Sequence, residues 1–299
     1  MKSGYVALIG VPNVGKSSLM NRLIGQKIAI TSDRPQTTRD RIETVYTEDR
    51  GQIVFVDTPG IHRAKNKLGQ YMDQVAERAF SDVDVILWLV EPKKGADAEE
   101  ERIALLLKSA AKKKPVLLVI NKCDQLAQKE AVREIAARYE GLVPFRETVP
   151  VSALTGSNTD TLLDSIFELL PEGPLFYDEE TVTTIPLREI AEELIREQAL
   201  RLLGDEIPHG IAVNVQKFSR RRPGLYDVEA DIVCEKESHK GIIIGRGGSM
   251  IKEIGTHARA EIEDQLGEQI NLKLFVKVRR NWRNNEGFIK SYGYDKKKR

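Results

Sequence analysis

The sequence has few cysteines, no long apolar run and almost no net charge. Its 299 residues include 2 cysteines, Cys123 and Cys234, far apart in the chain. This excludes a disulfide-stapled scaffold, and without a signal-peptide pattern at the start of the chain we expect a cytoplasmic protein. The longest apolar stretch, "VDVILWLV", is far shorter than the roughly 20 residues of a membrane-spanning helix.

The net charge of +1 gives no sign of a polyanionic partner, but the charge is unevenly distributed. Residues 151–200 carry 2 basic and 11 acidic side chains, a net charge of −9. Residues 270–299 carry 10 basic and 2 acidic ones, a net charge of +8. Charge is therefore segregated along the chain, with the basic excess at its C-terminal end.

The chain contains two successive regions with different patterns of apolar and polar residues. From residue 5 to about 172, short apolar runs alternate with amphipathic stretches. This predicts an α/β fold with a mainly parallel sheet covered by helices on both faces. A proline-bearing acidic stretch then predicts a linker, and an α+β unit is expected beyond it. We predict domains over 1–172 and 187–299, joined by a linker over 173–186.

Apolar runs and charge patterns place the expected elements. Strands are expected at "YVALIG", "QIVFVD", "VDVILWLV", "PVLLVIN" and "TVPVSA", and a helix at "DAEEERIALLLKSAAKK", which is acidic at its start and basic at its end. In the second region the helix "LREIAEELIREQALRLL" precedes the strands "GIAVNVQKFS" and "YDVEADIVCE". "SRRRP" at residues 219–223 is interpreted as a basic hairpin turn. Further helices and a basic strand, "INLKLFVKVRR", follow.

A glycine-rich loop lies between the first expected strand and the first expected helix. In "GVPNVGKSS", Gly10, Gly15, Lys16 and Ser17 match G-x-x-x-x-G-K-[ST] in the context that this pattern requires. The N–H groups of such a loop converge on phosphates, the lysine reaches the terminal pair, and the hydroxyl binds Mg²⁺. The loop therefore predicts a nucleotide phosphate site.

Three later segments predict which nucleotide binds. In "VFVDTPG", Asp57 can hold Mg²⁺ through water, and the Gly60 N–H can meet the last phosphate. In "VINKCD", Asp124 can accept two hydrogen bonds from guanine, whereas adenine offers no matching donor pair, so GTP is expected and not ATP. Asn121 and Lys122 are expected to brace this loop against the phosphate loop. "VSAL" can offer a backbone N–H to the guanine carbonyl.

"GVPNVGKS", "DTPG", "NKCD" and "SAL" resemble the successive motifs of the translation-factor-related GTPases, over residues 5–170. The resemblance implies a Mg²⁺-dependent GTP/GDP switch. In "SDRPQTTRDR" we expect Thr38 on Mg²⁺ and the terminal phosphate, with Thr37 as the adjacent competitor. The predicted metal ligands are thus Ser17, Thr38 and Asp57. The predicted GTP-binding residues are Gly10, Asn13, Val14, Gly15, Lys16, Ser17, Ser18, Asp57, Thr58, Gly60, Asn121, Lys122, Asp124, Ser152, Ala153 and Leu154.

Ile61 follows "DTPG", where many relatives carry a glutamine that orients the attacking water. Because isoleucine has no hydrogen-bonding side-chain atom, we expect slow intrinsic hydrolysis, helped by a partner, a repositioned water or a monovalent cation. Asn13 either holds K⁺ beside the phosphates, as relatives with asparagine here can, or only shapes the loop. His62 is interpreted as a surface histidine and not as a base. The predicted catalytic residues are Asn13, Lys16, Thr38 and Gly60.

A second glycine motif lies in the C-terminal region. "GIIIGRGGSMIKEIG" has the form I-I-G-x-x-G between two expected helices. The order helix, strand, strand, helix, GxxG, helix, strand is that of a type II KH domain, a fold that clamps about four single-stranded nucleotides. Arg246 can meet phosphate, apolar neighbours can flank bases, and the basic strand with Trp282 can add phosphate contacts and stacking. The predicted RNA-binding residues are Ile243, Ile244, Gly245, Arg246, Gly247, Gly248, Lys252, Lys277, Arg279, Arg280 and Trp282.

A GTPase domain joined to a C-terminal KH domain resembles the Era family across nearly the whole chain. The resemblance implies binding to the 3′ end of small-subunit (16S) ribosomal RNA and assistance in the maturation of the 30S subunit. Arg246 stands where lysine is frequent, and the charge is kept. The alternative is a membrane-surface signalling GTPase at the inner membrane, whose C-terminal domain binds protein or anionic lipid with the "KKKR" tail as an anchor. "NKCD" disfavours an ATP-using phosphotransferase.

Overall fold

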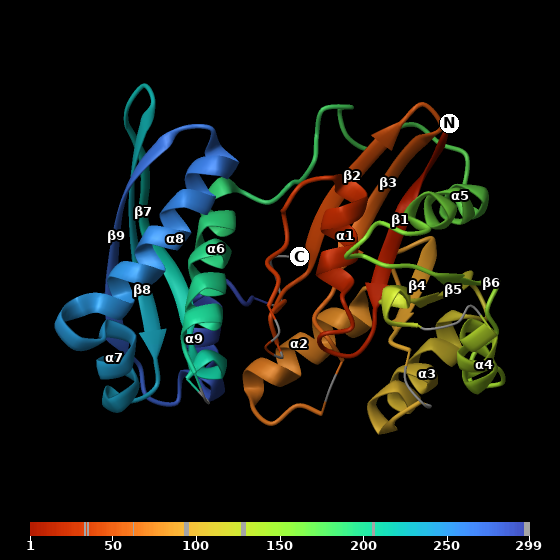
Figure 1. Cartoon of the computed structure of the whole chain (residues 1–299), viewed down its shortest axis with the longest axis horizontal. Coiled ribbons are helices and arrows are strands. Elements are labelled where there is room, and N and C mark those ends of the chain that lie inside the picture. Colours follow the sequence, from red (N-terminus) through yellow and green to blue (C-terminus); the bar gives the residue numbers. More distant parts are fainter. Residues whose placement is uncertain are drawn as a thin grey trace. The chain divides into compact units, whose positions relative to one another are not determined.

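The structure is a computed structural model that describes residues 1–32, 34, 36–61, 63–92, 96–126, 130–204 and 207–295. The chain divides into two compact units, which we describe separately (Figure 1). Unit 1 comprises Met1–Ala29, Thr38–Lys65 and Gly69–Thr184, and unit 2 comprises Ile30–Thr37, Asn66–Leu68 and Ile185–Arg299. The domain limits expected at 172 and 187 stay a prediction.

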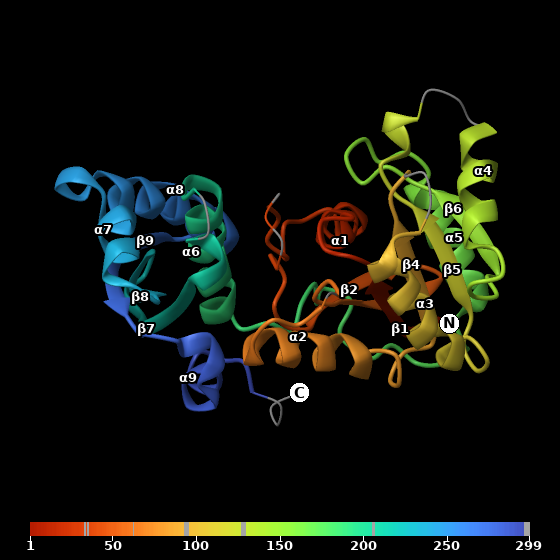
Figure 2. The same ribbon diagram turned by 90° about the horizontal axis from the view of Figure 1, so that it is seen from below.

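Unit 1 is built on a six-stranded sheet. Its strands are β1 Lys2–Ile9, β2 Ile42–Glu48, β3 Gly51–Asp57, β4 Val85–Val90, β5 Val116–Ile120 and β6 Glu147–Pro150, in the order β2-β3-β1-β4-β5-β6. Its helices are α1 Lys16–Ile24, α2 Lys67–Arg78, α3 Ala98–Ala110, α4 Glu130–Tyr139 and α5 Thr159–Leu169. Figures 1 and 2 show α1 and α2 on opposite faces of the sheet. The predicted parallel-rich α/β fold is confirmed, with β2 as an antiparallel strand.

The pattern of burial explains which strands could be predicted. β4 and β5 are buried along their whole length, as expected for central strands covered on both faces. β2 is absent from the sequence-based prediction because its letters, "IETVYTE", mix polar and apolar residues and form no apolar run. The expected acidic start of α3 is confirmed: Asp97 and Glu100 form a capping box there.

The segment that leads out of unit 1 is tied to the sheet. Val45 in β2 donates its N–H to the Val182 carbonyl at 2.8 Å. The buried side chain of Gln52 in β3 accepts a hydrogen bond from the Tyr177 N–H and donates one to the Tyr177 carbonyl, both at 3.0 Å. Residues 173–184 therefore form an ordered connector along β2 and β3.

Unit 2 packs helices against a three-stranded sheet. Its elements are α6 Leu187–Leu202, β7 Ala212–Arg222, β8 Leu225–Cys234, α7 Glu237–Ile244, α8 Ser249–Leu266, β9 Gln269–Val278 and α9 Glu286–Ser291. β8 pairs antiparallel with β7 and parallel with β9. The core joins apolar side chains of α6 and α8 to alternate residues of β8, such as Val228, Ala230 and Ile232. Among the helices that the structure describes, none has the length and apolar character needed to cross a membrane.

The hairpin between β7 and β8 turns later than predicted. Arg220, Arg221 and Arg222 continue β7, and the turn consists of Pro223 and Gly224. Gly224 has a φ of +79°, a backbone conformation that favours glycine. Within "SRRRP" only Pro223 belongs to the turn, because Arg220 and Arg222 still pair along the sheet.

Candidate functional site

The glycine-rich loop connects the end of β1 to the start of α1. Gly15 has a φ of +96°, and a Cβ added there would lie 2.3 Å from Asn121 Nδ2, so only glycine fits. The first N–H groups of α1 have no partner within the helix, which makes the loop a ready anion site. Val14 is fully buried, so only its main chain can reach a ligand, whereas Ser18 is exposed.

Lys16 lies folded over this loop. Its Nζ donates to the carbonyls of Gly10 and Val11, each at 3.1 Å. Burial lowers the pKa of Lys16 to about 8, and the negative charge of Asp57 opposes this shift. A buried cation that donates to two neutral carbonyls is poised to accept an anionic partner.

Three oxygen atoms meet beside Lys16. Ser17 Oγ donates to Asp57 Oδ2 at 2.6 Å, and Thr38 Oγ1 lies 2.9 Å from Ser17 Oγ and 3.3 Å from Asp57 Oδ2. The side chain of Thr37 is directed elsewhere, and its Oγ1 donates to the Arg34 carbonyl at 2.7 Å. The structure therefore brings together the three residues predicted to bind the metal, with Thr38 and not Thr37 among them.

The donor set fits Mg²⁺. Asp57 is fully buried, and burial raises its pKa while the neighbouring Lys16 lowers it. Asp57 Oδ1 is buried and lacks a well-formed hydrogen bond among the described residues. A hard cation that takes hydroxyl, carboxylate and phosphate oxygens, directly or through water, would satisfy that atom. Ser17, Thr38 and Asp57 are the residues that would hold it.

The base-recognition loops are joined to the phosphate loop by Asn121. Asn121 Nδ2 donates to the Val14 carbonyl at 2.8 Å, and its Oδ1 accepts the Ala153 N–H at 3.0 Å. Lys122 Nζ donates to the Asn13 carbonyl at 3.0 Å. The predicted bracing of the two loops is thus observed. Of the backbone N–H groups that "VSAL" is expected to offer to guanine, that of Ala153 donates to Asn121 in this structure.

Asp124 follows Lys122 in a short helical turn, Cys123–Gln125. Ser152 Oγ donates to Asp124 Oδ1, and this hydrogen bond restrains the orientation of the carboxylate. Leu154 in the same loop is 76% exposed. Ser152 therefore has an orienting role, and Asp124 keeps its other oxygen, Oδ2, as a further acceptor.

The turn after β3 backs onto the phosphate loop. Thr58 Oγ1 donates to the Leu8 carbonyl at 2.9 Å, which fixes the turn to β1. A Cβ added at Gly60 would lie 2.7 Å from the main chain of Pro12. Ile61 is 1% exposed and its N–H donates to the Gly10 carbonyl at 3.3 Å. His62 lies outside the described residues.

The GxxG turn of unit 2 joins α7 to α8. Gly245, Gly247 and Gly248 have φ values of +74°, +60° and +82°. Arg246 and Gly247 are exposed, whereas a Cβ at Gly245 would lie 2.7 Å from Met250. The turn therefore presents main chain and one cation to solvent, as a phosphate contact requires.

Two predicted base contacts are wrong. Ile243 is fully buried in the core of unit 2 and cannot flank a base. Trp282 is also fully buried, and its Nε1 donates to the Gly210 carbonyl at 2.9 Å. The half-buried Ile244 and the 51% exposed Ile242 are the apolar side chains that this end of α7 offers.

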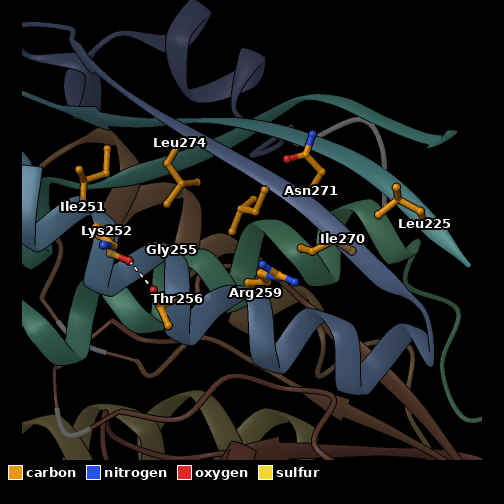
Figure 3. Close-up of a pocket in the computed structure, with 10 residues that line it drawn as sticks. Leu225, Ile251, Lys252, Gly255, Thr256, Arg259, Ile270, Asn271 and Leu274 are labelled. Carbon is orange, nitrogen blue, oxygen red and sulfur yellow. Dashed lines mark hydrogen bonds between the residues drawn. The ribbon is translucent and has the colours of Figure 1, made fainter.

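A groove of about 550 Å³ lies between α8 and β9 (Figure 3). Lys252, Gly255, Thr256 and Arg259 line it from α8, at a spacing that places them on one helix face. Leu274 lines it from β9. The groove thus combines apolar side chains with two cations and adjoins the helix that starts at the GxxG turn.

Of the predicted basic residues, only Lys252 lines this groove. Lys277 is paired with Asp231 at 2.6 Å, and Arg279 and Arg280 are exposed after β9. The "KKKR" tail lies outside the described residues. Thr256 and Arg259 also line the groove and are absent from the predicted residues, although their spacing from Lys252 places them on the same face of the expected helix. Arg22, which donates to the Ala153 carbonyl at 3.0 Å, is absent from the predicted residues as well.

Together, the fold and the two sites define a GTP-binding switch domain combined with a KH-type nucleic-acid-binding module. Residues 5–122 match the family described as 50S ribosome-binding GTPase, and residues 206–283 match the KH domain family. The chain is 50% identical over 297 residues to GTPase Era of Clostridioides difficile (strain 630), covering 99% of both chains. It is also 50% identical over 293 residues to GTPase Era of Geotalea daltonii, covering 98% of both.

Two solved structures are similar over both units. One is Aquifex aeolicus Era bound to GDP·AlF4⁻, with a TM-score of 0.94 and 38% identity, covering 98% of this chain and 99% of that one. The other is Era in complex with MgGDPNP and nucleotides 1506–1542 of 16S ribosomal RNA, with a TM-score of 0.93, 38% identity and the same coverage. The chain belongs to the Era family of GTPases.

Proposed function

We propose that this chain hydrolyses GTP as a switch, binds the 3′ end of small-subunit (16S) ribosomal RNA and assists 30S assembly and maturation in the cytoplasm. The observation that carries the proposal is the likeness, over both units, to the Era structure that holds MgGDPNP and 16S ribosomal RNA. The hydroxyl and carboxylate cluster at Ser17, Thr38 and Asp57 supports the nucleotide part. The GxxG turn and its groove support the RNA part.

In the proposed mechanism the phosphate loop binds first and orients the nucleotide. N–H groups around Gly15 hold the phosphates, and Lys16 exchanges the Gly10 and Val11 carbonyls for phosphate oxygens, which are stronger acceptors for a buried cation. Mg²⁺, when bound, neutralises charge on the terminal phosphates. The Ser17 and Thr38 hydroxyls and the Asp57 carboxylate would hold this cation.

Hydrolysis proceeds by attack of water on the terminal phosphorus and departure of GDP. Gly60 packs against the main chain of Pro12 in the phosphate loop, and we expect its N–H to donate to the terminal phosphate when GTP is bound. The Ile61 side chain is buried and apolar, so it neither polarises nor orients the attacking water. We therefore expect slow intrinsic turnover, with part of the transition-state stabilisation supplied from elsewhere.

We propose that K⁺ supplies part of that stabilisation at Asn13. Asn13 is exposed at the tip of the phosphate loop, with a φ of +64°, and its amide oxygen is the kind of ligand that K⁺ takes. GTP turnover is expected to be about tenfold faster in KCl than in NaCl at equal ionic strength, because one added cation offsets developing charge. The Asn13→Ala variant should lose the difference. Equal wild-type rates in the two salts would remove K⁺ from the proposal.

The experiment that tests the proposed function is a titration with a single-stranded oligonucleotide of the 16S ribosomal RNA 3′ end. The full chain is loaded with GDP or with a non-hydrolysable GTP analogue, and RNA affinity is measured in both forms at one stated salt concentration. We expect tighter binding in the analogue form, because the ligand that orders Thr38 shifts the population toward the RNA-binding state. Absence of RNA binding in both forms would overturn the proposal.

The membrane-surface alternative rests on the basic tail, which lies outside the described residues. No observation on the part of the chain that the structure describes favours it. Flotation with anionic phosphatidylserine vesicles, in parallel with the RNA titration, separates the two functions. Vesicle binding without RNA binding would favour the membrane switch.

A further inference from the structure

Helix α6 of unit 2 buries charged side chains along its middle. Arg196 is 1% exposed and Glu197 is fully buried. Burying such groups costs several kcal/mol per ion unless each is paired or hydrogen-bonded. The groups that pair with them therefore explain why the helix carries charge at these positions.

The partners lie in the segment Ile30–Thr37, which belongs to the same unit. The Arg196 guanidinium donates to the Thr37 carbonyl and also pairs with Glu193 on its own helix. Glu197 Oε1 accepts the Thr31 N–H at 3.0 Å. The two buried charges thus hold the main chain of this segment close to both of its ends.

Further contacts strengthen this hold. Ile30 is fully buried among the apolar side chains of the unit 2 core. Arg201, one turn beyond Glu197 on α6, donates to Glu197 Oε1 at 2.6 Å and to the Thr31 carbonyl at 3.4 Å. Arg34 donates to the Leu203 carbonyl at 3.4 Å. Ile30 therefore anchors the segment in the core, and buried charged side chains of α6 form hydrogen bonds with the main chain of Thr31 and Thr37.

The chain passes between the two units at several points, and one of them is the peptide bond between Thr37 and Thr38. Thr37 belongs to unit 2 and Thr38 belongs to unit 1, where its hydroxyl lies beside Ser17 and Asp57. Consecutive Cα atoms are about 3.8 Å apart, so fixing the main chain of Thr37 limits the positions that Thr38 can reach.

We propose that Arg196 and Glu197 are positioning residues of the Mg²⁺–GTP site, which act through Thr37 on Thr38. This inference rests on the proposed function and extends it: a helix of the RNA-binding unit sets how readily the triphosphate state forms. Thr38 contacts metal and terminal phosphate only in that state. Without these contacts the segment must become ordered when the triphosphate binds. The cost of that ordering lowers the affinity for the triphosphate and leaves the affinity for GDP unchanged.

The test compares Arg196→Met with wild type in the full chain with Mg²⁺, by measuring the affinities for GDP and for a non-hydrolysable GTP analogue. We expect analogue affinity to fall about tenfold while GDP affinity stays within twofold. Arg196→Lys keeps a charged donor and should restore part of the loss. Arg188→Met is the matched control, because Arg188 on the same helix also donates to a main-chain carbonyl, that of Val215 in β7.

A general loss of structure in unit 2 would also remove the contacts to Thr31 and Thr37, so the ratio of the two affinities is compared only among variants that keep the core of unit 2. The near-ultraviolet signal of the buried Trp282 reports whether each variant keeps its core. If Arg196→Met does not fold, Arg201→Met is the second variant. It removes a half-exposed side chain that contacts Glu197 and Thr31, and it should lower the analogue affinity about threefold. An unchanged ratio in the folded variants overturns this inference alone. Failure of the wild-type chain to bind either guanine nucleotide overturns the proposed function itself.

Discussion

Asp124→Asn is expected to lower affinity for GDP and GTP about a hundredfold or more. Asp124 presents a carboxylate whose orientation is set by Ser152 Oγ, and guanine offers two donors to such a group. Each hydrogen bond to a charged group contributes roughly 1.5–3 kcal/mol, and every 1.4 kcal/mol is about tenfold in affinity. Calorimetry with GDP measures the loss directly.

The same substitution should create affinity for xanthine nucleotides. Xanthine carries a carbonyl where guanine carries its exocyclic amine. The amide side chain of the variant can donate to this carbonyl and accept from the neighbouring ring N–H. Asp160→Asn, an exposed carboxylate on the same unit, is the control and should leave GDP affinity unchanged. Undiminished GDP binding by Asp124→Asn, or equal binding of ADP and GDP by wild type, would contradict the assignment of this loop to guanine.

Gly247→Asp should weaken RNA binding at least tenfold and leave GDP affinity intact. Gly247 is exposed, and a Cβ added there meets no atom within 4 Å, so the side chain has room. Its φ of +60° is a conformation that Asp and Asn adopt more readily than other residues. The variant therefore keeps the turn but places a negative charge where the RNA phosphates are expected.

Gly247→Asn is the matched control, because it has nearly the same shape without the charge. We expect the RNA affinity of Gly247→Asn to lie within about threefold of that of wild type. The difference in RNA affinity between the two variants should become smaller at higher salt. Equal losses in both variants would assign the effect to the turn's geometry. Unchanged RNA binding in Gly247→Asp would move the phosphate contact away from the GxxG turn.

Much of unit 1 could be predicted because its signals are local. A phosphate loop needs fixed residue types at fixed spacing between a strand and a helix, and the central strands are continuous apolar runs. Thr38 is preferred to Thr37 from the sequence, but Thr37 stays a competitor because both are threonines in one irregular segment. Only the fold places one hydroxyl on Ser17 and the other on the Arg34 carbonyl.

The two wrong base contacts in unit 2, Ile243 and Trp282, have a common cause, which is burial by other parts of the fold. Trp282 stands among arginines and asparagines and is expected at a wet basic surface, yet the Gly210 carbonyl and neighbouring aromatic rings enclose it. Arg196 and Glu197 have the spacing of ordinary helix-surface charges. Nothing local indicates that a segment about 160 residues earlier covers them, because such burial is a property of the tertiary fold.

The connector that leaves unit 1 also covers part of an exposed sheet edge. β2 is the outermost strand of its sheet, and a bare strand of that kind is a template for pairing with another chain. Val182 accepts the Val45 N–H, and Thr183 pairs with Thr44, so part of that template is already occupied within the molecule. The connector between the two units thus also covers part of an edge strand and reduces self-association. A freely flexible linker of equal length would leave that edge open.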